Sequence, residues 1–180
     1  SVSHSFSYRT IEGIVAAQYN RIRNWITPNG KLNYLEYRDN GDGTITVDGR
    51  TFTYTEKKVR VVTSYDGVEW CTIGHRNPEL YPNCVIPREH ATFSGLPARR
   101  GIVATYGFRE IVGGDRRWVG TALPMGTVVF IVGYGLGVVG DIHNSRTGPN
   151  MLDACYDPRE VLNGTDLGKT GRTVYILDMG

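Results

Sequence analysis

The sequence predicts a mainly β protein with a small closed barrel, preceded by an accessory α+β region. Its 180 residues include 23 glycines and 11 tyrosines, while long helical patterns are few. Short runs of β-branched and aromatic residues alternate with glycine-rich connections, which is typical of closed barrels rather than open sheets. A loop at 92–101 is the expected boundary. Residues 1–95 then form the accessory region and residues 96–180 form the barrel.

The clearest helical pattern covers residues 10–26. Thr10 is placed to cap the helix, and Pro28-Asn29-Gly30 ends it. The apolar residues that share one helical face are Ile11, Ile14, Val15, Ile22 and Trp25. The accessory region therefore begins with one amphipathic helix.

From residue 32 onward the pattern changes to strands and tight turns. Asn40-Gly41 and Asp42-Gly43 are hairpin signals. The expected strands of the accessory region are 44–47, 51–55, 59–63 and 68–73. Those of the barrel are 102–106, 128–132, 137–139, 151–157 and 174–177, with a single helical turn at 158–162.

Composition excludes several classes of protein. The net charge is only +2, and residues 101–180 carry slightly more acidic than basic side chains, so we expect no nucleic-acid partner. No apolar run approaches the length of a membrane span. Three cysteines fit neither a zinc ribbon nor a disulfide-rich scaffold; Cys71 and Cys84 either form a disulfide across a polar loop or stay free. The sequence does not indicate an oligomeric state.

Three aspartates between residues 123 and 157 are the candidate catalytic groups. Strand alternation places Asp153, Cys155 and Asp157 on one face of the 151–157 strand. If Asp141 lies nearby, the carboxylates repel as anions, and the least solvated one keeps a proton that it can donate. The alternative is structural: Asp157 starts a turn before Pro158, and Asp141 caps a loop.

This part of the chain resembles a known family. The string PMGTVVFIVGYGLGVVGD, followed by MLDACYD and then GRTVYIL, resembles the three-aspartate (3D) domain of bacterial cell-wall proteins. Upstream, Ala104-Thr105-Tyr106 is similar in position to the family's Thr-Ala-Tyr strand. The resemblance covers about residues 101–180. The family is similar to the catalytic part of membrane-bound lytic transglycosylase A.

The resemblance implies a double-psi β-barrel that acts on peptidoglycan glycan strands, in a secreted or cell-envelope protein. Such enzymes cleave the β-1,4 bond between N-acetylmuramic acid and N-acetylglucosamine and form a 1,6-anhydro product. One carboxylate suffices, because the sugar's own C6 hydroxyl is the nucleophile. By motif position, Asp153 is the acid and later the base, Asp141 is its partner, and Asp157 ranks third. No cofactor is implied.

Candidate substrate contacts are Thr105, Tyr134, His143 and Arg146. The last two lie in a loop, 142–147, that departs from the family pattern "Asp-Thr-Gly-Gly-x-Ile-Lys-Gly". His143 and Arg146 there could bind an N-acetyl or lactyl carboxylate group. An altered substrate or loss of activity is the alternative. A further alternative is a wall-polysaccharide-binding module on the same barrel, as in expansin-like proteins, and a third is a protein-binding module such as a protease inhibitor.

Other candidate sites have simpler structural explanations. A metal site from Asp141, His143 and His90 lacks a supporting framework, so we expect no metal. Cys155 is expected to be a small buried residue rather than a nucleophile. The calcium-like residues 39–45 are expected to form a hairpin turn. The aromatic residues of the N-terminal half are expected to pack rather than to bind sugars; they are Tyr34, Tyr37, Phe52, Tyr54, Tyr65 and Trp70.

Overall fold

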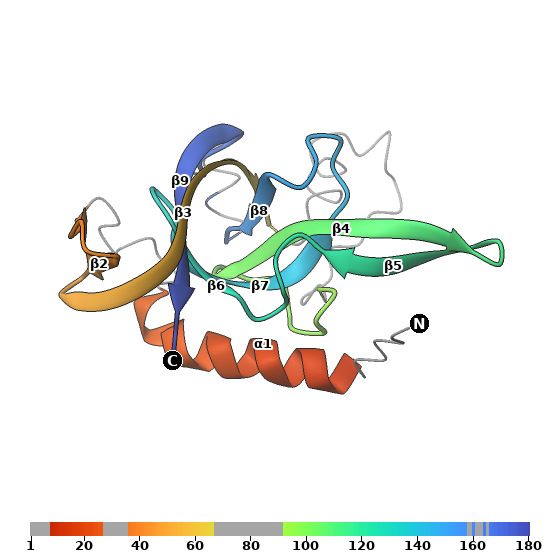
Figure 1. The fold of residues 1–180 in the computed structure, drawn as a ribbon, viewed down its shortest axis with the longest axis horizontal. Coiled ribbons are helices and arrows are strands. Elements are labelled where there is room, and N and C mark those ends of the chain that lie inside the picture. Colours follow the sequence, from red (N-terminus) through yellow and green to blue (C-terminus); the bar gives the residue numbers. More distant parts are fainter. Residues whose placement is uncertain (1–7, 27–35, 67–91, 158–159, 161–163, 165) are drawn as a thin grey trace.

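A computed structural model describes residues 8–26, 36–66, 92–157, 160, 164 and 166–180. The chain begins with helix α1 (Tyr8–Ile22) and a 3₁₀ helix, η1 (Arg23–Trp25). Strands follow in this order: β1 (Tyr37–Asp39), β2 (Thr44–Val47), β3 (Arg50–Tyr65), β4 (Ile102–Val112), β5 (Asp115–Thr121), β6 (Val128–Ile131), β7 (Gly135–His143), β8 (Met151–Cys155) and β9 (Thr170–Asp178) (Figure 1). The predicted mainly β composition and the amphipathic helix near the start of the chain are confirmed.

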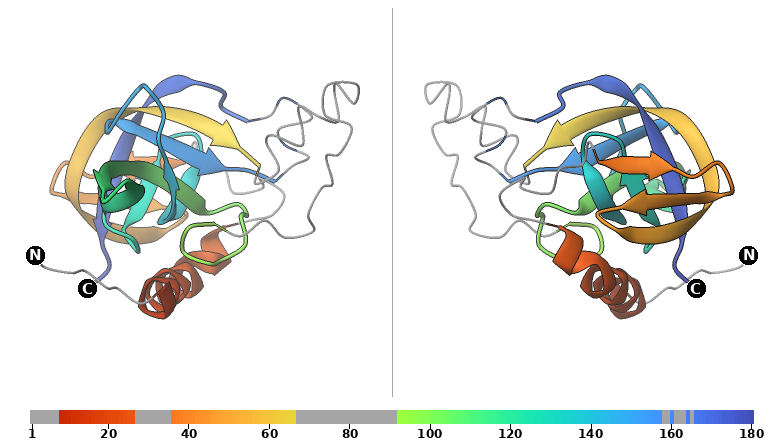
Figure 2. Two further views of the ribbon diagram at one scale, coloured as in Figure 1. Left: turned by 90° about the vertical axis from the view of Figure 1, so that its right-hand side faces the viewer. Right: turned by 90° about the vertical axis from the view of Figure 1, so that its left-hand side faces the viewer.

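Six strands close into a ring, which we call the barrel. Their order is β3-β8-β4-β7-β6-β9, and β9 pairs back onto β3 (Figure 2). The pairs β3–β8 and β4–β7 are parallel, and the other four are antiparallel. The β1–β2 hairpin extends the sheet from the other end of β3, and β5 pairs only with β4 among the described strands.

The barrel is not confined to residues 96–180, because β3 belongs to it. The segments predicted as two strands, 51–55 and 59–63, form one continuous strand. The polar residues Glu56, Lys57 and Lys58 between them do not end the strand, because they pair with β9 past a register shift at Tyr54 and Glu56. Such a bulge bends a strand without interrupting its pairing. The predicted strand 68–73 lies outside the described residues.

Side-chain alternation divides the core between the two faces of the barrel wall. On β6, Val128 and Phe130 belong to one buried cluster, and Val129 and Ile131 belong to the other. The first cluster includes Val15 of α1, which lies along the outside of the barrel against β7 (Figure 1). The first cluster is therefore on the outer face, and the second fills the interior.

Strands β4 and β5 form a hairpin that extends beyond the barrel (Figure 1). The turn is Gly113-Gly114, with φ of 59° and 87°, the positive values that a tight hairpin turn requires at both central positions. Sequence analysis missed β5 because almost every residue of this strand is exposed, which leaves no inward-facing apolar set to detect. Within the described ranges, no helix is long and apolar enough to cross a membrane.

Candidate functional site

Two of the three candidate aspartates lie in one row across the barrel wall. Asp153 on β8 and Asp141 on β7 are both register partners of Ala104, on the strand between them. Thr63 on β3 continues the row as the partner of Asp153. Neighbouring strands lie about 4.8 Å apart, so the Cα atoms of the two aspartates are about 10 Å apart. The row faces outward, because Leu152 and Ala154 on either side of Asp153 fill the barrel interior.

A β-bulge at Gly140 brings Asp141 onto this face. Val103 pairs with Val139 and Ala104 pairs with Asp141, so Gly140 is an extra residue in β7. Without it, alternation would turn the Asp141 side chain into the barrel. Gly140 lies against the helix: a Cβ built there would be 2.9 Å from Cγ1 of Val15.

Asp141 accepts three hydrogen bonds. The backbone N–H groups of Phe93 and Ile142 donate to Oδ1 at 3.0 and 2.9 Å, and the Tyr65 hydroxyl donates to Oδ2 at 3.0 Å. An ionised carboxylate offers acceptors only, which matches this set of donors. Burial, followed by the negative charge of Asp141, raises the pKa of Tyr65 well above 10, so its hydroxyl remains a donor.

Asp153 is partly buried, and its Oδ1 accepts a hydrogen bond from the Thr63 hydroxyl at 2.9 Å. The charges of Asp141 and Asp153 act on the same neighbours, because both raise the pKa of Tyr65 and of Cys155. Two carboxylates thus share one face, on either side of Ala104. Such an arrangement can hold and transfer a proton.

Thr63 and Tyr65 were missed by sequence analysis. Each hydrogen-bonds a candidate aspartate from a strand at least 76 residues distant in sequence. Strand alternation puts Thr63 and Tyr65 on one face of β3, but it does not indicate which distant strand pairs beside them. The segment Ala104-Thr105-Tyr106 lies on β4, where Ala104 is the register partner of both aspartates.

Asp157 does not extend the row, because β8 ends at Cys155. The backbone N–H of Asp157 donates to Oε2 of Glu160 at 3.0 Å, and its carbonyl accepts from the Glu160 N–H at 2.9 Å. Both bonds join Asp157 to Glu160, three positions further along the chain.

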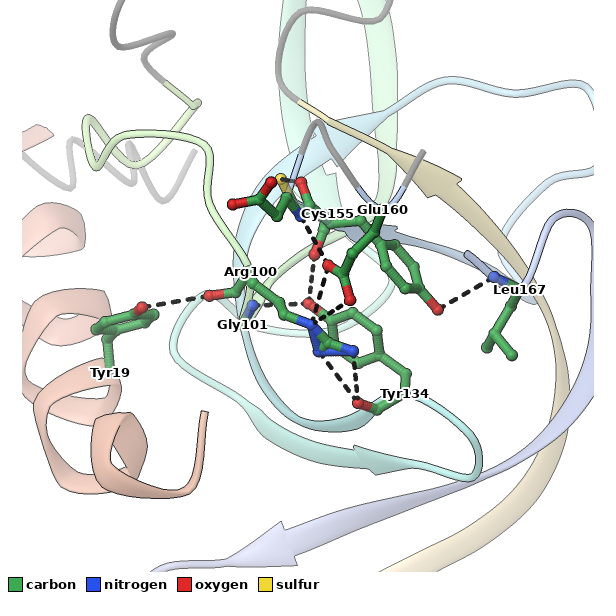
Figure 3. A network of polar contacts seen from close by, with 9 residues as sticks. Tyr19, Arg100, Gly101, Tyr134, Cys155, Glu160 and Leu167 are labelled. Atoms are coloured by element: carbon green, nitrogen blue, oxygen red, sulfur yellow. Dashed lines mark hydrogen bonds and ion pairs between the residues drawn. The ribbon is translucent and has the colours of Figure 1, made fainter. Parts of the chain in front are cut away.

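Two of the predicted substrate contacts are instead buried in the protein. Thr105 is 0% exposed, and its hydroxyl accepts a hydrogen bond from the Leu123 N–H at 3.0 Å. Tyr134 is also 0% exposed; its hydroxyl accepts from the Gly101 N–H at 2.7 Å and donates to the Cys155 carbonyl at 2.6 Å (Figure 3). The prediction that they contact substrate is therefore corrected, since both hydroxyls are engaged inside the protein.

His143 shares the face of Asp141, but both of its ring nitrogens are engaged. Nε2 lies 2.7 Å from the Met151 carbonyl, and Nδ1 accepts the Ser145 N–H at 3.2 Å, which assigns the proton to Nε2. Burial lowers the pKa of His143. The histidine therefore fastens the end of β7 to the start of β8. Arg146 is exposed in the following loop.

The alternative sites gain no support from the described residues. His90 lies outside them, and the described part of the chain contains no group of three side chains that could hold a metal. Cys155 is a free cysteine with 0% exposure, and burial raises its pKa, so the thiol stays protonated. The expectation of a small buried cysteine is confirmed. Cys71 and Cys84 lie outside the described residues.

The calcium-like residues form the hairpin that the sequence predicts. Strands β1 and β2 pair across the turn, and Asp39 accepts bonds from Lys57 at 2.7 Å and from the Tyr175 hydroxyl at 3.1 Å. These bonds, with the Gly41 N–H, lower the pKa of Asp39 to about 2. The nearby Tyr54 packs edge-on against Tyr175, at 5.0 Å between ring centroids. Of the predicted aromatic set, Tyr34 and Trp70 lie outside the described residues.

A buried ion pair supports the end of β8, two residues beyond Asp153 (Figure 3). Arg100 Nε lies 3.2 and 3.3 Å from the two carboxylate oxygens of Glu160. The guanidinium also lies over the rings of Tyr134 and Tyr156, at 4.8 and 5.1 Å. The Tyr19 hydroxyl of α1 donates to the Arg100 carbonyl at 3.2 Å. Arg100 thus bonds the helix through its carbonyl and Glu160, beyond the end of β8, through its side chain.

Comparison of the chain with family models, curated proteins and solved structures finds no match. Function is therefore argued from the site itself.

Proposed function

We propose that this protein is a lytic transglycosylase that cleaves the N-acetylmuramic acid–N-acetylglucosamine bond of peptidoglycan on a double-psi β-barrel. The observation that carries the proposal is the placement of Asp153 and Asp141 on either side of Ala104, on one outward face. The 3D-type motifs supply both aspartates. A six-stranded barrel with two parallel pairs supports the proposed barrel type.

In the proposed reaction, Asp153 donates its proton to the oxygen of the glycosidic bond, and the bond from that oxygen to C1 of the muramic acid breaks. The C6 hydroxyl of the same sugar then attacks C1, and its proton returns to Asp153. The 1,6-anhydro ring closes without water, so atoms and charge balance. Thr63 orients the acid through its hydrogen bond to Oδ1. Asp141, on the other side of Ala104, is the proposed partner of this acid.

The test is digestion of purified peptidoglycan, followed by mass analysis for 1,6-anhydromuropeptides. Asp153→Asn is expected to lower product formation by about a hundredfold or more, because general acid catalysis typically contributes this much. Asp178→Asn is the matched control, since Asp178 is exposed at the end of β9 and the bond it accepts comes from Gly180. Full activity in Asp153→Asn would refute the assigned role. If the wild-type protein releases no anhydro product, the reaction itself is wrong.

A wall-polysaccharide-binding module is the second candidate. The exposed aromatic side chains Phe108 and Trp118 on the β4–β5 hairpin favour it, because such side chains can stack on sugars. Cosedimentation with peptidoglycan in the absence of any anhydro product would select this function over the first. Both functions place the protein outside the cytoplasm, secreted or attached to the cell envelope.

A further inference from the structure

The β4–β5 hairpin carries most of the exposed apolar side chains of the described chain. Among all the described residues, seven large hydrophobic side chains are exposed. Five of them lie on this hairpin: Phe108, Ile111, Val112, Trp118 and Val119. A concentration of exposed apolar side chains on one element marks an interaction surface. The hairpin has two faces, and only one of them continues from the aspartate row.

Ala104, Tyr106 and Phe108 occupy successive positions on that face. They are two residues apart on β4. The two nearby register shifts arise from extra residues on the partner strands, Gly140 on β7 and Val119 on β5, and not from β4 itself. The β4 face is therefore unbroken. At about 3.3 Å per residue, Phe108 lies about 13 Å along the strand from the residue between the two aspartates.

We call Tyr106 and Phe108 the aromatic strip. Ring contacts fix the orientation of both side chains. The Phe108 and Tyr106 rings meet edge-on, with centroids 5.2 Å apart, and Tyr106 meets the His143 ring at 5.7 Å. His143 is itself held through both ring nitrogens. The strip is thus a preorganised surface, which lowers the entropic cost of binding.

The flank of Phe108 is open. Phe108 is 41% exposed. Its cross-strand partner on β5 is Gly120, which has no side chain to cover the ring. A Cβ built on Gly120 would have no atom within 4 Å. A ligand can therefore approach the Phe108 ring from the β5 side.

We propose that Tyr106 and Phe108 form a saccharide-stacking subsite for a β-1,4-linked, N-acetylated glycan strand that also passes the aspartate row. This inference rests on the proposed function and assigns part of its substrate site. Aromatic rings offer sugars a large, rigid apolar surface at low conformational cost. Glu110 follows Phe108 on the same face, opposite Arg117 on β5, so this end of the face offers both an acceptor and donors for hydrogen bonds with sugar hydroxyls.

The opposite face of the hairpin provides a matched control. Arg109, Ile111, Arg116 and Trp118 share it, as their cross-strand pairing shows. Ile111 is 74% exposed and does not lie on the strip. Truncating Ile111 therefore removes a similar apolar side chain from the same hairpin without changing the proposed subsite.

The experiment measures binding to purified peptidoglycan and to soluble β-1,4-linked N-acetylglucosamine oligomers, together with KM and kcat for anhydro-product release. Phe108→Ala is expected to weaken binding and raise KM about five- to tenfold with little change in kcat, as for loss of one stacking contact. Gly120→Leu is expected to do the same by covering the ring. Ile111→Ala is expected to stay within about twofold of wild type.

Wild-type binding by both Phe108→Ala and Gly120→Leu would overturn the subsite, as would preferential binding of the wild type to anionic lipid vesicles. If Phe108→Ala proves unfolded by its thermal transition, Gly120→Leu decides alone, because its new side chain enters open space. The two proposals fail separately. Unaltered binding in both Phe108→Ala and Gly120→Leu, with product lost in Asp153→Asn, rejects only the subsite. Weakened binding, with no product from the wild type, rejects only the transglycosylase.

Discussion

Replacing Arg100 by methionine tests whether the buried ion pair holds the end of β8. The side chains of Arg100 and Glu160 are only 7% and 16% exposed. Methionine keeps much of the aliphatic volume but removes the guanidinium that bonds the Glu160 carboxylate. We expect a large loss of stability, because breaking a mostly buried ion pair from one side is costly.

The magnitude follows from burial and from the stacking contacts. Breaking a buried pair by removing one partner typically costs about 3–5 kcal/mol, and partial exposure of Glu160 places this pair toward the lower end. Loss of the cation–π contacts with Tyr134 and Tyr156 adds about 1 kcal/mol or more. We therefore expect Arg100→Met to lower the free energy of unfolding by about 4 kcal/mol.

Urea denaturation followed by circular dichroism measures this loss, with an unchanged m-value as the check on two-state unfolding. Arg117→Met is the control, because its ion pair with Asp115 spans 4.0 Å between side chains that are 62% and 77% exposed; it should cost less than about 0.5 kcal/mol. Arg100→Met/Glu160→Gln should recover at least about 1 kcal/mol relative to additive losses. A loss below about 1 kcal/mol in Arg100→Met, or strict additivity, would refute the reasoning.

Three further predictions concern the surroundings of the site. Burial lowers the pKa of His143, so its contribution to stability is complete above the unfolded-state pKa of 6.5 and is lost as pH falls through the lower folded-state pKa. Between pH 7.5 and pH 5, the free energy of unfolding measured in urea should therefore fall less in His143→Gln than in wild type. Equal falls in the two proteins would contradict this. Because Cys155 is buried with a raised pKa, iodoacetamide at pH 8 should label its peptide only in concentrated urea, as read by mass spectrometry; rapid native labelling would contradict it. Gly140→Val should cost about 1–3 kcal/mol in urea unfolding because its Cβ would press on Val15, whereas Gly120→Ala should be nearly neutral, and equal costs would count against the packing argument.

Local patterns in the sequence were sufficient for much of the fold. Strand 44–47 was predicted at its observed bounds, and the helix, β6 and β9 were located within a few residues. These segments have regular apolar periodicity and clear turn residues at their ends. The closed arrangement was also predicted, since short strands without long helices must bury both faces of a sheet.

Residues whose roles depend on distant strands were not predictable in this way. Thr63 and Tyr65 reach the aspartates only because β3 joins β8 in parallel and β9 in antiparallel pairing. Arg100 looks like an ordinary loop cation in sequence, yet its 8% exposure results from packing between Tyr134 and Tyr156. Such roles follow from tertiary packing, which local patterns do not encode.

The orientation of Asp141 shows why the site itself needed a structure. Regular alternation from Val138 and Val139 would turn the Asp141 side chain inward, away from Asp153. Because Gly140 is an extra residue in β7, the Asp141 side chain points to the outer face instead. Glycine is favoured at the bulge because a Cβ there would lie 2.9 Å from Cγ1 of Val15 on α1. The packing of α1 against β7 therefore restricts the residue type at the bulge that turns Asp141 to the face of Asp153.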